Sequence, residues 1–244
     1  MKYKRIVSLC LAVVFCFGLS VSAFAADPAA KKVTDFHDYD PTAWYAEAVE
    51  AAIENGLLIG KSATRLDPNG YLTRAEMAAV INRSFGTYKT TEISQYKDVP
   101  KNAWYYKDVQ MAVWMGTYEG TNKTTMAPEK SITRQEIMTV VARALQLDLD
   151  RYADTDLSKF SDYRQVSDWA LPYVKAMVGA GYIQGRNTGL APQDSITRAE
   201  FAQVFYNIIR QYIVKSGSFS GSLEGNLHWK MNDNDIWQII SRLN

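Results

Sequence analysis

Three copies of one set of motifs limit what this chain can fold into. Six landmarks recur in one order: an aromatic-x-Asp motif, a tryptophan, two glycines, a proline and a Thr-Arg-x-Glu tetrapeptide. The tryptophans are 60 and 65 residues apart. A repeat of this length indicates copies of one supersecondary unit that share a core. The recurring positions are Phe36, Tyr96 and Phe160; Asp38, Asp98 and Asp162; Trp44, Trp104 and Trp169; Gly56, Gly116 and Gly181; Gly60, Gly120 and Gly185; Pro68, Pro128 and Pro192; and the tetrapeptides at 73–76, 133–136 and 197–200.

Each copy contains two segments with helical periodicity. The first (44–55, 104–115 and 169–180) begins at the tryptophan and ends on a glycine, the usual left-handed stop of a helix. The second follows the tetrapeptide and has an apolar face such as Met77, Val80, Ile81 and Phe85. One helix pair cannot bury its apolar stripe alone. We therefore predict an all-α fold of three helix-loop-helix units around a common core.

The composition agrees with a globular protein of 244 residues, 47% hydrophobic and 22% charged. We place the three repeats at 33–88, 93–147 and 160–213. An acidic stretch at 148–159 lacks the glycine and terminal Glu of a calcium-binding EF-hand loop, so a solvated linker is the favoured interpretation. Residues 214–244 form a Gly/Ser linker and a short tail, too short for a catalytic domain.

The first 25 residues indicate a secretory signal peptide. Three cations precede an apolar run of 14 residues, and small residues at Ala23 and Ala25 fit the cleavage site. The run is too short to span a membrane. Both cysteines, Cys10 and Cys16, lie in this segment. We therefore expect a secreted chain of 219 residues without cysteine, which excludes disulfides and cysteine-based metal, redox or catalytic sites.

Charge and motif content argue against other functional classes. Without its three signal-peptide cations the chain has 24 basic and 26 acidic side chains, a net charge of −2. Such a balance does not favour nucleic-acid binding. The chain has two histidines, His37 and His228, and no Gly-x-Ser-x-Gly motif or metal-ligand cluster. We expect no catalytic activity and no metal or cofactor.

The tetrapeptide fits a helix-capping box. Thr73 at the N-cap and Glu76 three residues later satisfy the first amides of a helix, and Leu72 can pack on Met77 across the cap. Capping explains the threonine and glutamate of every copy, which are Thr73 and Glu76, Thr133 and Glu136, and Thr197 and Glu200.

Capping does not explain the arginines. Arg74, Arg134 and Arg198 occupy the first helical position, where the helix dipole disfavours a cation by some tenths of a kcal/mol. A guanidinium beside free backbone N–H groups can grip a carboxylate or phosphate bidentately. We favour this anion receptor over the alternative, a salt bridge between units.

The tryptophans and aspartates admit two interpretations each. Trp44, Trp104 and Trp169 are expected in the first helical turn, where such a residue is more often a core anchor than a platform for sugar stacking. Asp38, Asp98 and Asp162 either cap turns or accept hydrogen bonds from sugar hydroxyls.

Together the motifs resemble three S-layer homology domains over residues 33 to 213. This resemblance implies a pseudo-threefold arrangement around a central helical bundle, with grooves between repeats that bind a secondary cell-wall polymer through pyruvylated N-acetylmannosamine. It also implies non-covalent attachment to a Gram-positive-type cell wall. The ligand residues that it implies are Arg74, Arg134, Arg198, Asp38, Asp98, Asp162, Trp44, Trp104, Trp169, Gly60, Gly120 and Gly185.

The second copy departs most from the pattern, with Gln135 in place of an alanine and Thr121 where the other copies have Lys61 and Arg186. Two alternatives to polymer binding stay open. The chain is a surface adaptor that recruits a protein partner through its tail, or it is a truncated remnant of a longer exoprotein.

Overall fold

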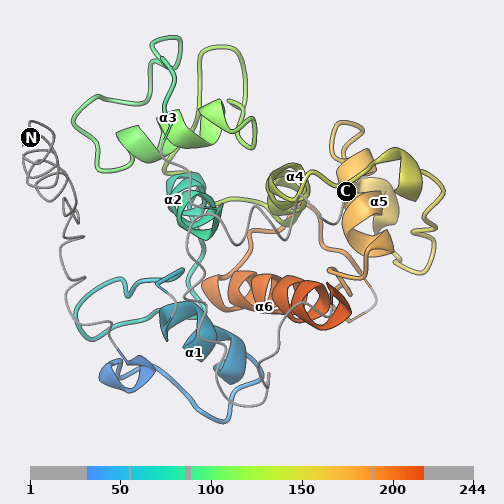
Figure 1. Cartoon of the computed structure of the whole chain (residues 1–244), viewed down its shortest axis with the longest axis horizontal. Coiled ribbons are helices and arrows are strands. Elements are labelled where there is room, and N and C mark those ends of the chain that lie inside the picture. Colours follow the sequence, from blue (N-terminus) through green and yellow to red (C-terminus); the bar gives the residue numbers. More distant parts are fainter. Residues whose placement is uncertain (1–31, 55, 86–88, 188, 217–244) are drawn as a thin grey trace, which may run out of the picture. The chain divides into compact units, whose positions relative to one another are not determined.

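The computed structural model describes residues 32–54, 56–85, 89–187 and 189–216, so the predicted signal peptide and C-terminal tail lie outside the described residues. Within these ranges the chain forms α-helices and short 3-10 helices and has no named strand, which confirms the all-α prediction (Figure 1). The elements are η1 (Val33–Asp35), α1 (Ala46–Glu54), α2 (Arg74–Phe85), α3 (Tyr106–Trp114), α4 (Arg134–Ala144), η2 (Asp150–Tyr152), η3 (Tyr163–Gln165), α5 (Leu171–Gly179) and α6 (Arg198–Ser216).

The first helix of each repeat begins two residues after its tryptophan. Trp44 lies in a turn before α1, and the N–H of Ala46 donates to the carbonyl of Ala43 at 3.0 Å. The expectation that the tryptophans lie in the first helical turn is therefore wrong, because a tight turn precedes each helix. The predicted stops are confirmed: Gly56, Gly116 and Gly181 have φ of 66°, 72° and 80°, the left-handed region that glycine adopts without a Cβ penalty.

Helices pack across repeats. Helix α3 of repeat 2 packs on α2 of repeat 1, and α5 of repeat 3 packs on α4 of repeat 2. Helix α1 of repeat 1 packs on α6 of repeat 3, so the last contact joins the two ends of the repeat array (Figure 1). Each first helix thus buries its apolar face against the second helix of another repeat.

The backbone before the second helices also pairs in a cycle. The N–H of Leu72 donates to the carbonyl of Ile196 at 3.1 Å, Ile196 to Ile132 at 3.1 Å, and Ile132 to Leu72 at 2.9 Å. All three side chains are buried. A threefold arrangement of the repeats would produce such a cycle, in which each segment pairs with the other two. The pseudo-threefold symmetry itself stays a prediction.

One hydrophobic cluster includes residues of all three repeats. The predicted apolar faces are buried, with Met77, Ile137 and Phe201 at equivalent positions of α2, α4 and α6. A shared core follows directly, since no repeat buries these side chains alone.

The acidic stretch is more ordered than a solvated linker. It contains η2, which packs on α5, and it buries Leu157. Its carboxylates cap local turns: Asp148 accepts from the N–H of Asp150 at 3.1 Å, and Asp156 from that of Ser158 at 2.8 Å. Among the described residues no group of three or more His, Cys, Asp or Glu side chains is placed to hold a metal ion, and no helix there is long and apolar enough to cross a membrane.

Candidate functional site

The three tetrapeptide arginines begin α2, α4 and α6, and each reaches into the next repeat. Arg74, Arg134 and Arg198 are only 5%, 5% and 3% exposed. Their Nε atoms donate to backbone carbonyls; for Arg74 the acceptor is Met126 at 2.9 Å. Arg134 and Arg198 make equivalent bonds of 2.8 and 3.0 Å. Each of the three arginines therefore joins its own repeat to the next one.

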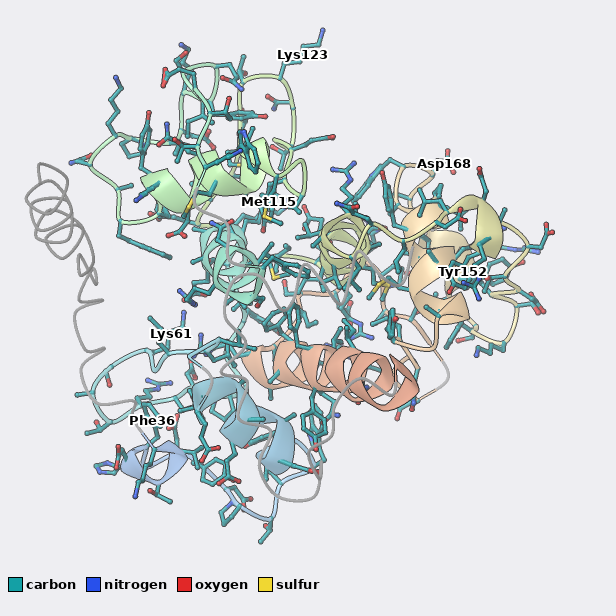
Figure 2. The ribbon with its side chains drawn as sticks, viewed as in Figure 1. Phe36, Lys61, Met115, Lys123, Tyr152 and Asp168 are labelled. Carbon is teal, nitrogen blue, oxygen red and sulfur yellow. The ribbon has the colours of Figure 1, made fainter. Side chains whose placement is uncertain are left out.

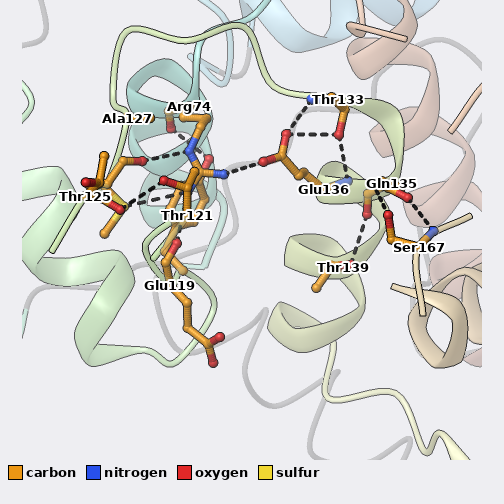
Figure 3. Close-up of polar contacts among 12 residues, drawn as sticks. Arg74, Glu119, Thr121, Thr125, Ala127, Thr133, Gln135, Glu136, Thr139 and Ser167 are labelled. Atoms are coloured by element: carbon orange, nitrogen blue, oxygen red, sulfur yellow. Dashed lines mark hydrogen bonds and ion pairs between the residues drawn. The ribbon is translucent and has the colours of Figure 1, made fainter. Parts of the chain in front are cut away.

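Arg74 is the most completely engaged of the three (Figure 3). Its Nη1 forms an ion pair with Glu136 at 2.8 Å, and its Nη2 donates to the carbonyl of Glu119 at 2.9 Å. The guanidinium lies 5.2 Å from the ring centroid of Tyr118, whose hydroxyl donates to the carbonyl of Arg74 at 2.7 Å. This is the inter-unit salt bridge that was the alternative to an anion receptor.

Arg134 and Arg198 are less fully compensated. The ion pair of Arg134 with Glu200 is longer, at 3.7 Å. Nη2 of Arg198 donates to the carbonyl of Ile59. Burial lowers the pKa of both guanidinium groups below the usual value of arginine, although nearby carboxylates oppose the shift. A buried cation with incomplete compensation gains from an anionic ligand.

The helix amides are not free, contrary to the anion-receptor hypothesis. The N–H of Arg74 donates to the carbonyl of Lys130 at 2.9 Å, and the N–H groups of Arg134 and Arg198 make equivalent bonds of 2.9 Å. These N–H groups are already hydrogen-bonded because the segments that precede the second helices pair with segments of other repeats. Anion binding would therefore rest on the side chains rather than on the backbone of the helix start.

The three aspartates hold a strained turn. Asp38 accepts from the N–H groups of Leu66 at 2.8 Å and Asp67 at 2.7 Å. Asp98 and Asp162 accept from the equivalent amide pairs at 2.6 to 2.9 Å. The second residue of each pair has a positive φ, 59°, 53° and 49°, which is unfavourable for a residue with a Cβ. The turn-capping interpretation is what the geometry shows, and sugar contact by these aspartates stays a prediction.

The second loop glycines lie against the aromatic residues of the first motif. A Cβ on Gly60 would overlap the ring of Phe36, and one on Gly185 would overlap the ring of Phe160. On Gly120 it would lie 2.5 Å from the carbonyl oxygen of Asn122. Glycine is thus required by close packing at these positions, and a ligand contact there stays a prediction.

The three tryptophans are not core residues. Trp44 and Trp104 are each 64% exposed, and Trp169 is 53% exposed. Trp44 and Trp104 stand edge-on to the buried tyrosine that follows each of them, with ring centroids 5.4 Å apart. A rigidly supported, exposed indole is suited to stacking on a sugar ring.

Among the pockets that the described residues form, two lie between repeats, and each takes residues from all three repeats. We call groove 1 the 260 Å³ pocket formed by the repeat 1 loop and α2, with Trp104 of repeat 2 and Arg198 of repeat 3. Groove 2 is the 450 Å³ pocket formed by the repeat 2 loop and α4, with Arg74 of repeat 1 and Trp169 of repeat 3. The two grooves are built alike: an arginine from one neighbour and a tryptophan from the other.

Matches to known proteins bear on this arrangement. The family model described as the S-layer homology domain matches residues 35–78, 95–138 and 159–202. The chain belongs to the S-layer homology domain family. Each match begins at or just before an aromatic-x-Asp motif and ends just beyond a Thr-Arg-x-Glu box, so the matched segments contain the arginines, aspartates and tryptophans discussed above.

Several proteins resemble this S-layer homology chain over most or half of its length. The surface-layer 125 kDa protein of Lysinibacillus sphaericus is 32% identical over 71% of the chain, and the amylopullulanase of Thermoanaerobacterium thermosulfurigenes is 30% identical over 78%. The S-layer protein sap of Bacillus anthracis is 30% identical over 55%. The chain spans 15%, 10% and 15% of the lengths of these three proteins.

Sequence reasoning missed one side-chain network in the second S-layer homology repeat. Gln135 is buried, and its Oε1 accepts from the N–H of Ser167 at 3.0 Å while its Nε2 donates to the hydroxyl of Ser167 at 3.1 Å. The amide also reaches Gln193 at 3.3 Å. These bonds fix the segment that carries Trp169 against the start of α4. The replacement of alanine by glutamine was visible in the sequence, but its partner 32 residues away was not.

Proposed function

We propose that this chain attaches non-covalently to the bacterial cell wall by binding an anionic secondary cell-wall polymer in the grooves between its repeats. The family match and the similarity to S-layer proteins indicate a cell-surface, cell-wall-associated protein. The proposal adds the ligand, a polymer whose sugars carry carboxylates as pyruvyl ketals.

The observation that carries the proposal is the shared composition of grooves 1 and 2. Each combines a buried arginine, an exposed tryptophan and a loop, contributed by three different repeats, and the loop supplies Lys61 to groove 1 and Glu119 and Thr121 to groove 2. A polymer that contains carboxylated sugars presents the matching groups: an anion for a guanidinium that lacks a carboxylate partner, hydroxyls for the polar loop side chains, and an apolar ring face for the indole. A ligand in either groove would therefore contact residues of all three repeats.

The proposal assigns attachment and no catalysis. Some relatives are enzymes, such as the amylopullulanase, which the chain matches over 10% of that protein's length. The match to this chain is explained by the S-layer homology segments, which anchor rather than catalyse.

Sedimentation with purified cell-wall sacculi tests the proposal. The chain is expected to sediment with intact sacculi and to stay in solution with sacculi whose secondary polymer has been removed by hydrofluoric acid. Equal sedimentation with both preparations would overturn the proposal, because peptidoglycan would then be sufficient.

Tryptophan variants test the grooves themselves with little risk to the fold. Trp104→Ala combined with Trp169→Ala removes one exposed indole from each groove, and the apparent affinity for sacculi is expected to fall about tenfold, since each aromatic contact contributes on the order of 0.5–1.5 kcal/mol. Trp114→Ala is the matched control, because Trp114 is 47% exposed and lines neither groove. If the double variant and the Trp114→Ala control lose the same affinity for sacculi, the grooves are not the binding sites.

A further inference from the structure

The residue after the second loop glycine decides which partner the capping-box glutamate takes. In repeat 1 this residue is Lys61, on the loop between α1 and α2 (Figure 2). The ammonium group of Lys61 pairs with the carboxylate of Glu76. In repeat 3 it is Arg186, which pairs with Glu200 through two nitrogens. Repeat 2 has Thr121, which carries no charge.

Because Thr121 leaves Glu136 without a loop cation, the glutamate takes the arginine of the neighbouring repeat. The Arg74–Glu136 ion pair is 2.8 Å long, whereas the Arg134–Glu200 pair, where Arg186 competes for the carboxylate, is 3.7 Å long. A cation at this loop position thus weakens or removes the ion pair between the glutamate and the arginine of the neighbouring repeat.

Groove 1 shows this effect most clearly. Lys61 occupies Glu76, and the described residues include no carboxylate within ion-pair distance of Arg198, which donates to the carbonyls of Leu66 and Ile59. Of these three charged groups two are cations and one is an anion, so groove 1 keeps an excess positive charge beside its pocket. Arg83 also lines this groove and donates to the carbonyl of Leu57 at 2.9 Å.

Groove 2 has its charges paired internally. Arg74 is bound to Glu136, and Arg143 is bound to Glu119 at 3.3 Å. Lys130 is the remaining cation in its lining and is exposed, where water screens its charge.

Neutral hydrogen-bonding groups make up much of the remaining lining of groove 2. They are Thr117, Thr121, Thr133, Gln135, Thr139 and Gln193. Hydroxyl and amide groups both donate and accept, as sugar hydroxyls and acetamido groups require. The pocket is also the larger of the two, 450 Å³ against 260 Å³.

We propose that the two grooves select different sugar units of one polymer: groove 1 takes a carboxylated sugar, groove 2 takes an uncharged one, and the identity of residue 61 or 121 sets this choice. The inference rests on the proposed function and adds to it a specificity-determining position. By the same rule, Arg186 predicts selectivity for a carboxylated sugar at the loop of repeat 3.

Fluorine NMR of the full chain labelled with 5-fluorotryptophan can observe each groove separately, because Trp104 lines groove 1 and Trp169 lines groove 2. Replacing each tryptophan by phenylalanine assigns its resonance. The probes are the methyl glycosides of N-acetylmannosamine with and without a 4,6-pyruvyl ketal, which brings one carboxylate and one methyl group and replaces two hydroxyls. The pyruvylated probe is expected to shift the Trp104 resonance at a concentration at least about tenfold lower than the Trp169 resonance, and the uncharged probe is expected to show the reverse order.

Exchange of the deciding residue should exchange the preference. Thr121→Lys is expected to pair with Glu136, release Arg74 and strengthen binding of the pyruvylated probe in groove 2 by about tenfold. Thr121→Met, which has similar length without charge, is the matched control and should leave the preference unchanged. Lys61→Thr is expected to weaken binding of the pyruvylated probe in groove 1 by about tenfold and to leave the circular dichroism spectrum unaltered.

The outcomes separate the two proposals. Equal responses of the Trp104 and Trp169 resonances to the pyruvylated probe, or no effect of Thr121→Lys, would overturn the groove selectivity and leave polymer attachment intact. No response of either resonance to either sugar, together with failed sedimentation on sacculi, would overturn both proposals.

Discussion

At the scale of single residues, several motif side chains hold the fold, and some of them, such as Arg74, also line a groove. Asp38 caps the turn that Asp67 enters with a positive φ, and Arg74 ties repeat 1 to repeat 2. Such residues would recur in every copy whether or not a ligand were bound. The exposed tryptophans differ, because at more than half exposure Trp104 and Trp169 contribute little to the core. Substitutions of the tryptophans therefore test ligand binding, and substitutions of the aspartates test the stability of the fold.

Acid is expected to destabilise the protein through its bonded carboxylates. Burial alone would raise the pKa of Asp38, but the N–H groups of Leu66 and Asp67 outweigh it and hold the pKa below its usual value. The pKa values of Glu76 and Glu200 are also lowered, because Lys61 or Arg186 and the capping N–H overcome burial.

Since these folded-state pKa values lie below the unfolded ones, the stabilisation is complete above about pH 5 and is lost as the pH falls through about 4 and below. Urea unfolding midpoints measured from pH 7 to pH 3 should decrease over the lower part of this range. Asp38→Asn should lower the midpoint at pH 7 and flatten the decrease. A midpoint that rises as the pH falls would contradict the expected direction.

At the scale of elements, the second helices begin where the capping box predicts. The hydroxyl of Thr133 accepts from the N–H of Glu136, and the carboxylate of Glu136 accepts from the N–H of Thr133 at 2.8 Å. The first helices are less well predicted. Their apolar periodicity includes the tryptophan, but the chain forms a turn around Trp44 and helix α1 begins at Ala46.

Loss of one N-cap should have a small and measurable cost. Thr73 accepts from the N–H of Glu76 at 3.1 Å, so Thr73→Ala is expected to lower the free energy of unfolding by about 1 kcal/mol. Thr73→Ser keeps the hydroxyl and is expected to retain most of the stability. Denaturant unfolding of both variants measures the difference, and equal losses would show that the methyl group rather than the cap matters.

At the scale of the whole molecule, the repeats depend on one another. Helices α1, α3 and α5 each pack on the second helix of a different repeat, and the segments around Leu72, Ile132 and Ile196 bond in a cycle. Removing one repeat therefore exposes apolar faces and unpaired backbone groups in both of the others.

The described repeats are expected to unfold together. Differential scanning calorimetry should show one transition whose van't Hoff enthalpy matches the calorimetric enthalpy, because no repeat keeps its core after its neighbours unfold. A chain that ends at residue 147 lacks both α5 and α6 and is expected to show no cooperative transition. Separate transitions for the repeats, or a cooperative transition of the shortened chain, would contradict this dependence.

The sequence by itself determined the number of units, the helical class, the capped second helices and the residue types of the site, because local hydrogen bonding and periodicity are written in neighbouring residues. Tertiary structure decided which repeats touch: Arg74 meets Glu136 after 62 residues, and Arg198 meets Leu66 after 132. It also decided that the helix amides are occupied and the tryptophans exposed. These outcomes depend on how the three repeats pack against one another. They could not be predicted from the sequence, because contacts between distant segments leave no pattern in neighbouring residues.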